Sequence, residues 1–221
     1  MIALDLIANF VPPLKPTDTV AWANTLMVDF KVNHLPIVGN DGNFLGLISD
    51  EVLIEENNRD TLLETLSLSN FGNFVYEQQH IYEVIRVIYE QNLSLIPVTN
   101  NEQKYLGIIT LNTLIENMVN LQSLSDAGAI IVLEVGQHDN SLAFIAQIIE
   151  AQDTKILSIS TRHIPQSTQV EITVKVNKTD ISQILSAFTR YKIDVKATFN
   201  HQDKYNNVAD RYQSLMNYLS F

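Results

Sequence analysis

Two stretches of the chain carry hydrophobic residues at helical spacing, and the same series of shorter apolar segments follows each of them. One stripe lies in 20–30, after Asp18, whose residue type commonly caps helix N-termini, and a matching stripe lies in 81–88. Each stripe precedes an apolar strand, a polar turn and a second apolar strand, within 34–48 and 95–109. A helix is predicted to follow, so each unit is expected to have the order strand–helix–strand–strand–helix.

These two units are an internal repeat. Residues 34–55 align with residues 95–116 without a gap, at a constant offset of 61. Eight aligned pairs are identical: Pro36/Pro97, Asn40/Asn101, Leu45/Leu106, Gly46/Gly107, Ile48/Ile109, Leu53/Leu114, Ile54/Ile115 and Glu55/Glu116. One such unit is small for a stable core, so two copies, about 1–60 and 61–122, are expected to bury their sheet faces against each other.

The chain beyond residue 122 follows a different pattern. A small, polar stretch at 123–129 is predicted to be a linker. Over 130–200 the apolar residues predict the order β-α-β-β-α-β, which is the ferredoxin-like topology, with candidate N-caps at Asp139 and at Thr179-Asp180. The remaining tail, 201–221, is predicted to contain a helix with the apolar stripe Val208, Tyr212, Leu215 and Leu219. The expected fold class is therefore α/β (α+β).

Composition narrows the classes of partner. The 221 residues carry a formal net charge of −11, so nucleic acid and anionic membrane surfaces are not expected partners. The absence of cysteine excludes disulfides, thiolate catalysis and Cys-ligated metal sites. The first residues lack the basic flank of a signal peptide, and no apolar run reaches the roughly 18 residues of a membrane span. We expect a cytoplasmic protein.

The repeat resembles a tandem pair of CBS domains. The resemblance rests on the paired segments 35–37 and 96–98, each with a central proline, and on LGLIS and LGIIT, which end at Ser49 and Thr110. It implies a compact module with pseudo-two-fold symmetry and two clefts between the repeats. In many members of the family these clefts bind adenosine nucleotides or related molecules, and two modules commonly pair as a disc-shaped homodimer.

The segment 130–200 resembles an ACT domain, as found in small bacterial proteins related to the acetoin-utilisation protein AcuB. The resemblance rests on the order of elements and on residues 133–160. ACT domains often bind amino acids and dimerise by joining sheets edge to edge. The family usually has a glycine before the first helix, where a ligand approaches the backbone, but this chain has Asn140 or Ser141 there. A structural or dimerising role is therefore favoured over an amino-acid site.

Ser49 and Thr110 are the first candidates for ligand binding. A hydroxyl at the start of a helix, beside free backbone N–H groups, can hold a phosphate, and it can equally serve as a simple helix cap. In the family, a carboxylate three residues later accepts hydrogen bonds from the ribose hydroxyls, but Val52 and Thr113 occupy those positions. Asp50 stays a candidate because it adjoins Ser49, although it comes two residues too early for that ribose contact.

Pro36 and Pro97 are the remaining candidates. In the family the backbone near this proline often contacts the base of the ligand. The alternative interpretation is that each proline lies in an edge strand, where it blocks further pairing, and the sequence alone favours this alternative.

No catalytic or metal-binding pattern is found among the remaining residues. The five histidines are widely separated, with no spacing typical of a transition-metal site, and no nucleophile or phosphate-loop motif is present. The leading hypothesis is a non-enzymatic regulatory protein, a homodimer whose CBS cleft binds a small metabolite such as AMP, ADP, ATP or S-adenosylmethionine. The alternative is a scaffold that dimerises and binds a protein partner without a ligand.

Overall fold

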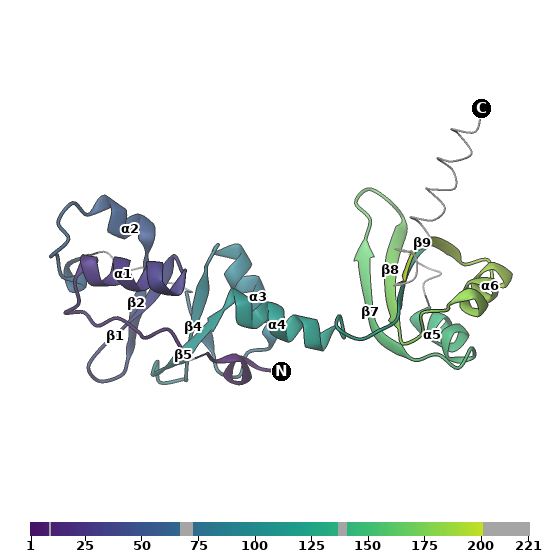
Figure 1. The fold of residues 1–221 in the computed structure, drawn as a ribbon, viewed down its shortest axis with the longest axis horizontal. Coiled ribbons are helices and arrows are strands. Elements are labelled where there is room, and N and C mark those ends of the chain that lie inside the picture. The colour runs from purple at the N-terminus through teal and green to yellow at the C-terminus, as the bar shows by residue number, and fades with distance from the viewer. Residues whose placement is uncertain (9, 67–72, 137–140, 201–221) are drawn as a thin grey trace, which may run out of the picture. The chain divides into compact units, whose positions relative to one another are not determined.

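The computed structural model describes residues 1–8, 10–66, 73–136 and 141–200 (Figure 1). The chain divides into two compact units, 1–118 and 119–221. Helix α4 (Leu111–Leu121) crosses this division, and the first module was expected from the sequence to end at 122. The helix predicted in the tail lies outside the described residues.

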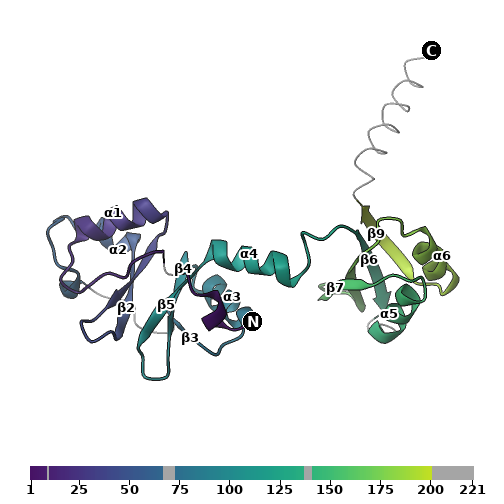
Figure 2. The same ribbon diagram turned by 60° about the horizontal axis from the view of Figure 1, so that its bottom comes forward.

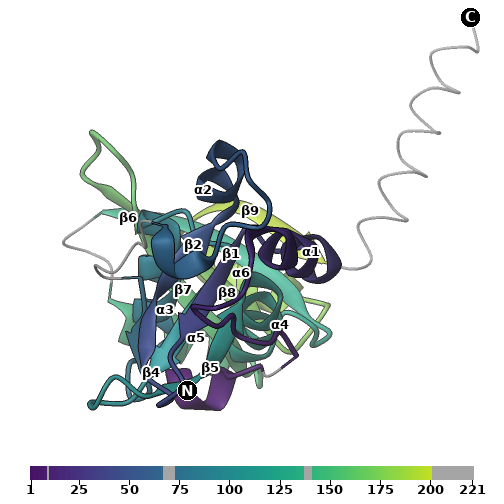
Figure 3. The same ribbon diagram turned by 90° about the vertical axis from the view of Figure 1, so that its left-hand side faces the viewer.

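The first unit contains both repeats, and each repeat contributes a helix, a hairpin and a second helix. Corresponding elements begin 61 residues apart. The first repeat has α1 (Val20–Phe30), β1 (His34–Val38), β2 (Phe44–Ser49) and α2 (Asp50–Glu55). The second repeat has β3 (Val75–Tyr76), α3 (Ile81–Glu90), β4 (Leu95–Thr99), β5 (Tyr105–Thr110) and α4. In the first repeat, helices α1 and α2 lie next to each other (Figure 3).

The first strand of each repeat is short. Strand β3 pairs in parallel with β4, matching Val75 with Val98, whereas in the first repeat the same position is an isolated parallel bridge between Leu14 and Ile37. The Leu14 N–H donates to the carbonyl of Pro36, and the N–H of Val38 donates back to Leu14, both at 2.8 Å. The predicted order is therefore present in both repeats, with its first strand reduced to one bridge in the first.

The edge-strand interpretation was wrong for Pro97, whereas for Pro36 it holds apart from one isolated bridge. Strand β4, which contains Pro97, is the central strand of the sheet β3-β4-β5, and β1 has β2 on one side and the Leu14 bridge on the other. Pro36 takes part through its carbonyl oxygen alone, and the next donor in the ladder is the N–H of Val38. A proline fits here because the bridge is too short to need its missing N–H.

The two repeats meet at pairs of residues that occupy equivalent positions. Asn43 and Lys104, which are 61 residues apart, form an antiparallel bridge between the two hairpins. Its two hydrogen bonds are equivalent under the same offset: Phe44 N–H donates to the Gln103 carbonyl, and Tyr105 N–H donates to the Gly42 carbonyl, both at 3.0 Å. A pseudo-two-fold axis therefore passes through this bridge.

A short 3₁₀ turn from each repeat packs against the other repeat. The 3₁₀ turn η1 (Ala3–Leu6) binds the second repeat, where the N–H of Ala3 donates to the carbonyl of Gln79 at 2.8 Å. The 3₁₀ turn η2 (Leu63–Thr65) binds the first repeat, where the N–H of Leu63 donates to the carbonyl of Asp18 at 2.9 Å. The sequence interpretation of repeats as 1–60 and 61–122 did not predict this exchange.

Two predicted helix caps were wrong. Thr19, and not Asp18, caps α1, because its Oγ1 accepts from the backbone N–H three residues later at 3.3 Å. The carboxylate of Asp18 instead accepts from the N–H of Lys15 in the preceding turn, at 2.7 Å. Ser141 caps α5 (Leu142–Glu150), again through the N–H three residues later, and the predicted cap Asp139 lies outside the described residues.

The second unit has the predicted β-α-β-β-α-β order. Its strands are β6 (Ala129–Gly136), β7 (Ile156–His163), β8 (Gln169–Val176) and β9 (Asp194–Asn200), and they form one antiparallel sheet in the order β7-β8-β6-β9. Helices α5 and α6 (Ser182–Arg190) lie on the same side of this sheet (Figures 1 and 2). The N-cap of α6 is Ile181, just after the predicted Thr179-Asp180 pair, and Asp180 accepts a hydrogen bond from the Ser182 N–H at 3.1 Å.

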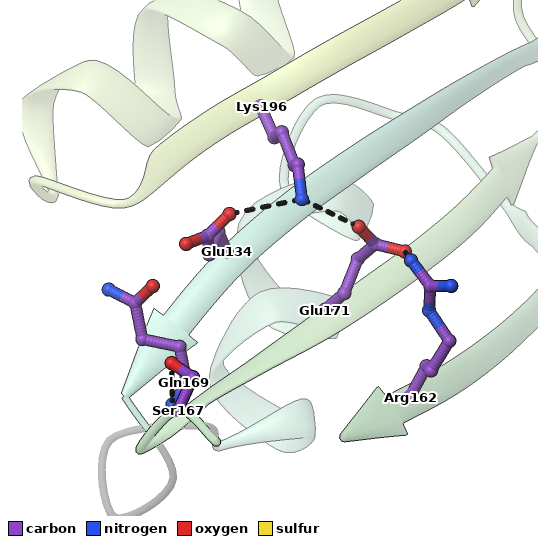
Figure 4. A network of polar contacts seen from close by, with 6 residues as sticks. All are labelled: Glu134, Arg162, Ser167, Gln169, Glu171 and Lys196. Carbon is purple, nitrogen blue, oxygen red and sulfur yellow. Dashed lines mark hydrogen bonds and ion pairs between the residues drawn. The ribbon is translucent and has the colours of Figure 1, made fainter. Parts of the chain in front are cut away.

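The sheet of the second unit carries a row of alternating charges (Figure 4). The ammonium of Lys196 lies 3.2 Å from Glu134 and 2.9 Å from Glu171, and Glu171 also accepts from Arg162 at 2.7 Å. The hydrogen bond from Lys196 is the main reason why the pKa of the Glu171 carboxyl lies below its usual value. Such exposed pairs contribute little stability each, so this network orients side chains more than it holds the fold together.

The core of the first unit contains a polar side chain, Thr99, at a position that is apolar in the first repeat. The side chain of Thr99 is fully buried, and its hydroxyl has no hydrogen-bond partner among the described residues, while the equivalent residue of the first repeat is Val38. We predict that Thr99→Val raises the free energy of unfolding by about 1 kcal/mol, because it removes an unsatisfied buried hydroxyl with little change of shape. Urea denaturation measures the change.

Thr110→Val is the matched control for this substitution. Thr110 is also buried, but its hydroxyl accepts from the N–H of Thr113 at 3.2 Å and caps α4. The same replacement there should lower the free energy of unfolding by about 1 kcal/mol. Equal destabilisation by both substitutions would show that the Thr99 hydroxyl has a partner in solution.

Candidate functional site

A cleft of about 580 Å³ opens in the first unit where the two repeats meet. It is formed by the start of β1, the end of β2, the first turn of α2 and the loop between α3 and β4. The lining residues are Asn33, His34, Leu47, Ser49, Asp50, Glu51, Val52, Asn73, Gln91, Asn92, Leu93, Ser94 and Leu111. The volume lies in the range typical of small-molecule sites.

At the cleft, equivalent residues of the two repeats contact each other. Asn33 and Ser94 are 61 residues apart, and the Asn33 N–H donates to Ser94 Oγ at 2.9 Å. Ser94 also contacts His34: its N–H donates to His34 Nδ1 at 3.3 Å, and its Oγ lies 3.2 Å from the same nitrogen. These contacts join the starts of β1 and β4 at the cleft.

Two of the candidates for ligand binding, Ser49 and Asp50, line the cleft. Ser49 ends β2 and caps α2, and its Oγ accepts from the Val52 N–H at 3.5 Å. The N–H of Asp50 donates to the Asn33 carbonyl at 2.9 Å, which ties the start of α2 to the start of β1. The helix-cap role and a position at the cleft therefore occur together at Ser49.

The other three candidates lie elsewhere. The hydroxyl of Thr110 is buried, where it caps α4 and contacts the Thr113 hydroxyl at 3.0 Å. Pro36 and Pro97 are buried in the middle of β1 and β4. None of the three lines the cleft.

Sequence reasoning missed the residues that the second repeat contributes. The loop 91–94 brings Asn92 and Ser94 to the cleft, and Asn73 comes from the segment before β3. The 61-residue offset already implied that Asn33 and Ser94 are equivalent. That they touch depends on how the two hairpins pack about the axis, and no local pattern encodes this packing.

Two acidic side chains line the cleft. Asp50 and Glu51 line it, whereas none of its lining residues in the described part of the chain is Lys or Arg. Burial lowers the pKa of His34 below its usual value near 6.5, and the two carboxylates oppose this shift without cancelling it. The imidazole is therefore mainly neutral at pH 7, so the cleft has a negative electrostatic character.

The described residues contain no group of three or more His, Asp or Glu side chains placed to hold a metal ion.

In the second unit, Ser141 lies just before α5, where ACT domains usually have a glycine. Its Oγ accepts from the Phe144 N–H at 3.2 Å. None of the described helices is long and apolar enough to cross a bilayer.

Comparison with protein families matches the CBS domain to residues 5–58 and 73–120 of this chain. Comparison of folds finds a CBS domain pair/ACT domain protein from Thermotoga maritima, which is 20% identical, with a TM-score of 0.50 over 54% of this chain and 98% of that one. A CBS-pair protein from Arabidopsis thaliana, solved in complex with AMP, is 19% identical, with a TM-score of 0.48 over 54% of this chain and 96% of that one.

Among curated proteins, an inosine-5'-monophosphate dehydrogenase from Methanocaldococcus jannaschii is 24% identical over 155 residues. The alignment covers 67% of this chain and 30% of that enzyme. The chain spans 30% or less of the length of this enzyme and of three homoserine O-acetyltransferases that it also matches. Most of each of these relatives therefore has no counterpart in this chain.

The environment of His34 predicts a pH dependence of stability. Because burial lowers its pKa in the folded state, the unfolded chain binds more protons as the pH falls through 6.5. The free energy of unfolding is therefore unaffected by the titration of His34 above pH 6.5. It decreases as the pH falls from this value towards the lowered pKa, because protonation of His34 favours the unfolded chain. We predict that the wild type loses more free energy of unfolding between about pH 7.5 and pH 5 than His34→Asn does.

Denaturant titrations at several pH values measure this difference. His34→Asn retains a side-chain acceptor for the Ser94 N–H but cannot titrate, so it isolates the protonation effect. Identical pH profiles for the two proteins would contradict the account.

Proposed function

Because residues 5–58 and 73–120 form a pair of CBS domains, we propose that this chain is a regulatory protein whose cleft binds a small adenosine-containing metabolite. The supporting observation is the 580 Å³ cleft at Ser49, between the two repeats. Candidate ligands are AMP, ADP, ATP and S-adenosylmethionine. The proposed role is sensing without catalysis.

The lining of the cleft suits recognition of a nucleoside. Amide side chains from both repeats, including Asn33 and Asn92, offer both donors and acceptors, which the edge of a base and ribose hydroxyls require. Leu47, Val52 and Leu93 provide an apolar wall against which a base can pack. A few polar groups set in a mainly preformed cleft are typical of ligand sites.

We propose that one ligand binds to each chain. The cleft at Ser49 offers a hydroxyl that is only partly buried, whereas the equivalent hydroxyl, that of Thr110, is buried and contacts Thr113. The equivalent positions have therefore diverged, and the pseudo-symmetry of the fold does not extend to two equal sites.

A ligand in the cleft would contact two helices of the first unit. The lining of the cleft includes the first turn of α2, at Asp50 to Val52, and the first residue of α4, Leu111. A ligand that contacts both helices would favour one relative position of α2 and α4 over others. Helix α4 begins at Leu111 and continues past the division between the two units, so it connects the cleft to the second unit along the chain.

We further propose that the protein acts as a homodimer formed through the helices of both repeats. Two equivalent pairs of apolar side chains are largely exposed: Val28 and Tyr89 are 75% and 85% exposed, and Ile54 and Ile115 are 75% and 62% exposed. Apolar side chains at matching sites of a pseudo-symmetric module suit a two-fold interface, in which each copy offers the same surface.

A ligand-free scaffold is the second candidate function. It is favoured by Val52 and Thr113, which stand where the family has a ribose-binding carboxylate. On this account the exposed helices bind a partner protein and the cleft stays empty.

Restoring the carboxylate distinguishes the two candidates. If the cleft binds an adenosine ligand, Val52→Asp should tighten the affinity for S-adenosylmethionine roughly tenfold, because a carboxylate in the cleft gains hydrogen bonds to the ribose. Thr113→Asp, at the equivalent position, is the matched control and should not tighten binding. Isothermal titration calorimetry should give one ligand per chain, and an absence of binding in the wild type and in Val52→Asp would favour the scaffold.

A charge in the exposed helical surface tests the dimer. Ile54→Glu should convert the dimer to a monomer, since it would bury an unpaired carboxylate in an apolar contact. Asn101→Glu adds the same charge at an exposed hairpin turn and should leave the dimer intact. Light scattering after size exclusion measures the mass; a wild-type monomer, or an Ile54→Glu dimer, would contradict the proposed interface.

A further inference from the structure

We propose that the cleft at Ser49 selects adenosine ligands that carry no net negative charge, so that a sulfonium or an uncharged nucleoside binds in preference to a phosphorylated nucleotide. This inference rests on the proposed function and specifies the chemical class of its ligand. It follows from the two carboxylates that line the cleft, Asp50 and Glu51, and from the absence of Lys and Arg among its described lining residues.

The carboxylates of the cleft are not neutralised by the protein. Asp50 and Glu51 both line it, and in the described part of the chain every ion pair lies in the second unit, so neither carboxylate is paired with a cation. A phosphate entering the cleft would be repelled by both carboxylates, Asp50 being partly buried and Glu51 exposed, and salt screens repulsion between charges this close only in part. A positively charged group would be attracted by the same two side chains.

The groups that could bind a phosphate are already occupied or neutral. The Ser49 hydroxyl accepts from the Val52 N–H at the start of α2, which uses one of the N–H groups that would otherwise face an anion. The Asp50 N–H is bonded to the Asn33 carbonyl. The imidazole of His34 lies in the cleft, but its Nδ1 accepts from the Ser94 N–H, and burial favours its neutral form.

The two repeats differ in charge at a position next to the cleft. Asn92 lines the cleft just after α3, and its equivalent after α1 is Lys31, 61 residues earlier. Both residues have the same left-handed backbone, with φ of 52° at Asn92 and 54° at Lys31. A lysine therefore fits this backbone position, and the cleft holds a neutral amide where the equivalent position of the first repeat holds an ammonium.

A series of adenosine compounds that differ in charge tests the inference. The probes are S-adenosylmethionine, with a net charge of about +1, uncharged 5'-methylthioadenosine, AMP and ATP, titrated calorimetrically into the full chain at pH 7.5 and low salt. We expect affinity to fall in that order, with methylthioadenosine binding at least tenfold more tightly than AMP. Added salt should narrow the gap, since it screens repulsion.

Two substitutions that add the same charge provide matched controls. Asn92→Lys places an ammonium in the cleft and should raise the ratio of AMP affinity to methylthioadenosine affinity at least tenfold. Asn101→Lys places it at an exposed turn between β4 and β5 and should leave that ratio unchanged. Glu51→Gln should shift the ratio in the same direction as Asn92→Lys.

The outcomes separate this inference from the function on which it rests. AMP or ATP binding to the wild type as tightly as methylthioadenosine would overturn the charge selection and leave the adenosine site in place. No binding of any of the four probes, to the wild type or to Asn92→Lys, would overturn the proposed function and the inference together.

Discussion

The contact between equivalent residues of the two repeats is the constraint on which the first unit depends. At one end of the module, Asn43 and Lys104 pair the hairpins through two hydrogen bonds that exchange under the 61-residue offset. At the cleft, Asn33 donates to Ser94, its own equivalent. A single repeat can make neither contact, because each needs a second copy turned about the axis. The cleft is therefore a property of the pair.

The constant offset of the repeat is why much of the fold could be predicted from the sequence. An ungapped alignment fixes the order and the starts of corresponding elements, and alternation of apolar residues distinguishes the strands of the second unit from its helices. Helix caps were predicted less well. Thr19 and Asp18 are both good cap residues, and the choice between them depends on which oxygen reaches an N–H of the first turn.

Long-range packing accounts for what the sequence did not reveal. The exchange of η1 and η2 between repeats is not visible in any local pattern, because Ala3 and Leu63 appear only as apolar residues near a repeat boundary. Pro97 was misassigned because residue type alone indicates an edge strand, whereas β4 lies between β3 and β5. In the cleft, Ser49 was identifiable and Ser94 was not, since its role comes from a contact across the axis.

The cleft between the repeats is the feature on which the proposed binding of a small adenosine-containing molecule depends. The most direct test is an amide NMR titration of the full chain with 5'-methylthioadenosine. We expect the amide chemical-shift changes to concentrate at the residues that line the cleft, in 33–34, 47–52 and 91–94, and to saturate at one ligand per chain. Shifts that cluster elsewhere, or none at saturating ligand, would contradict the proposed binding.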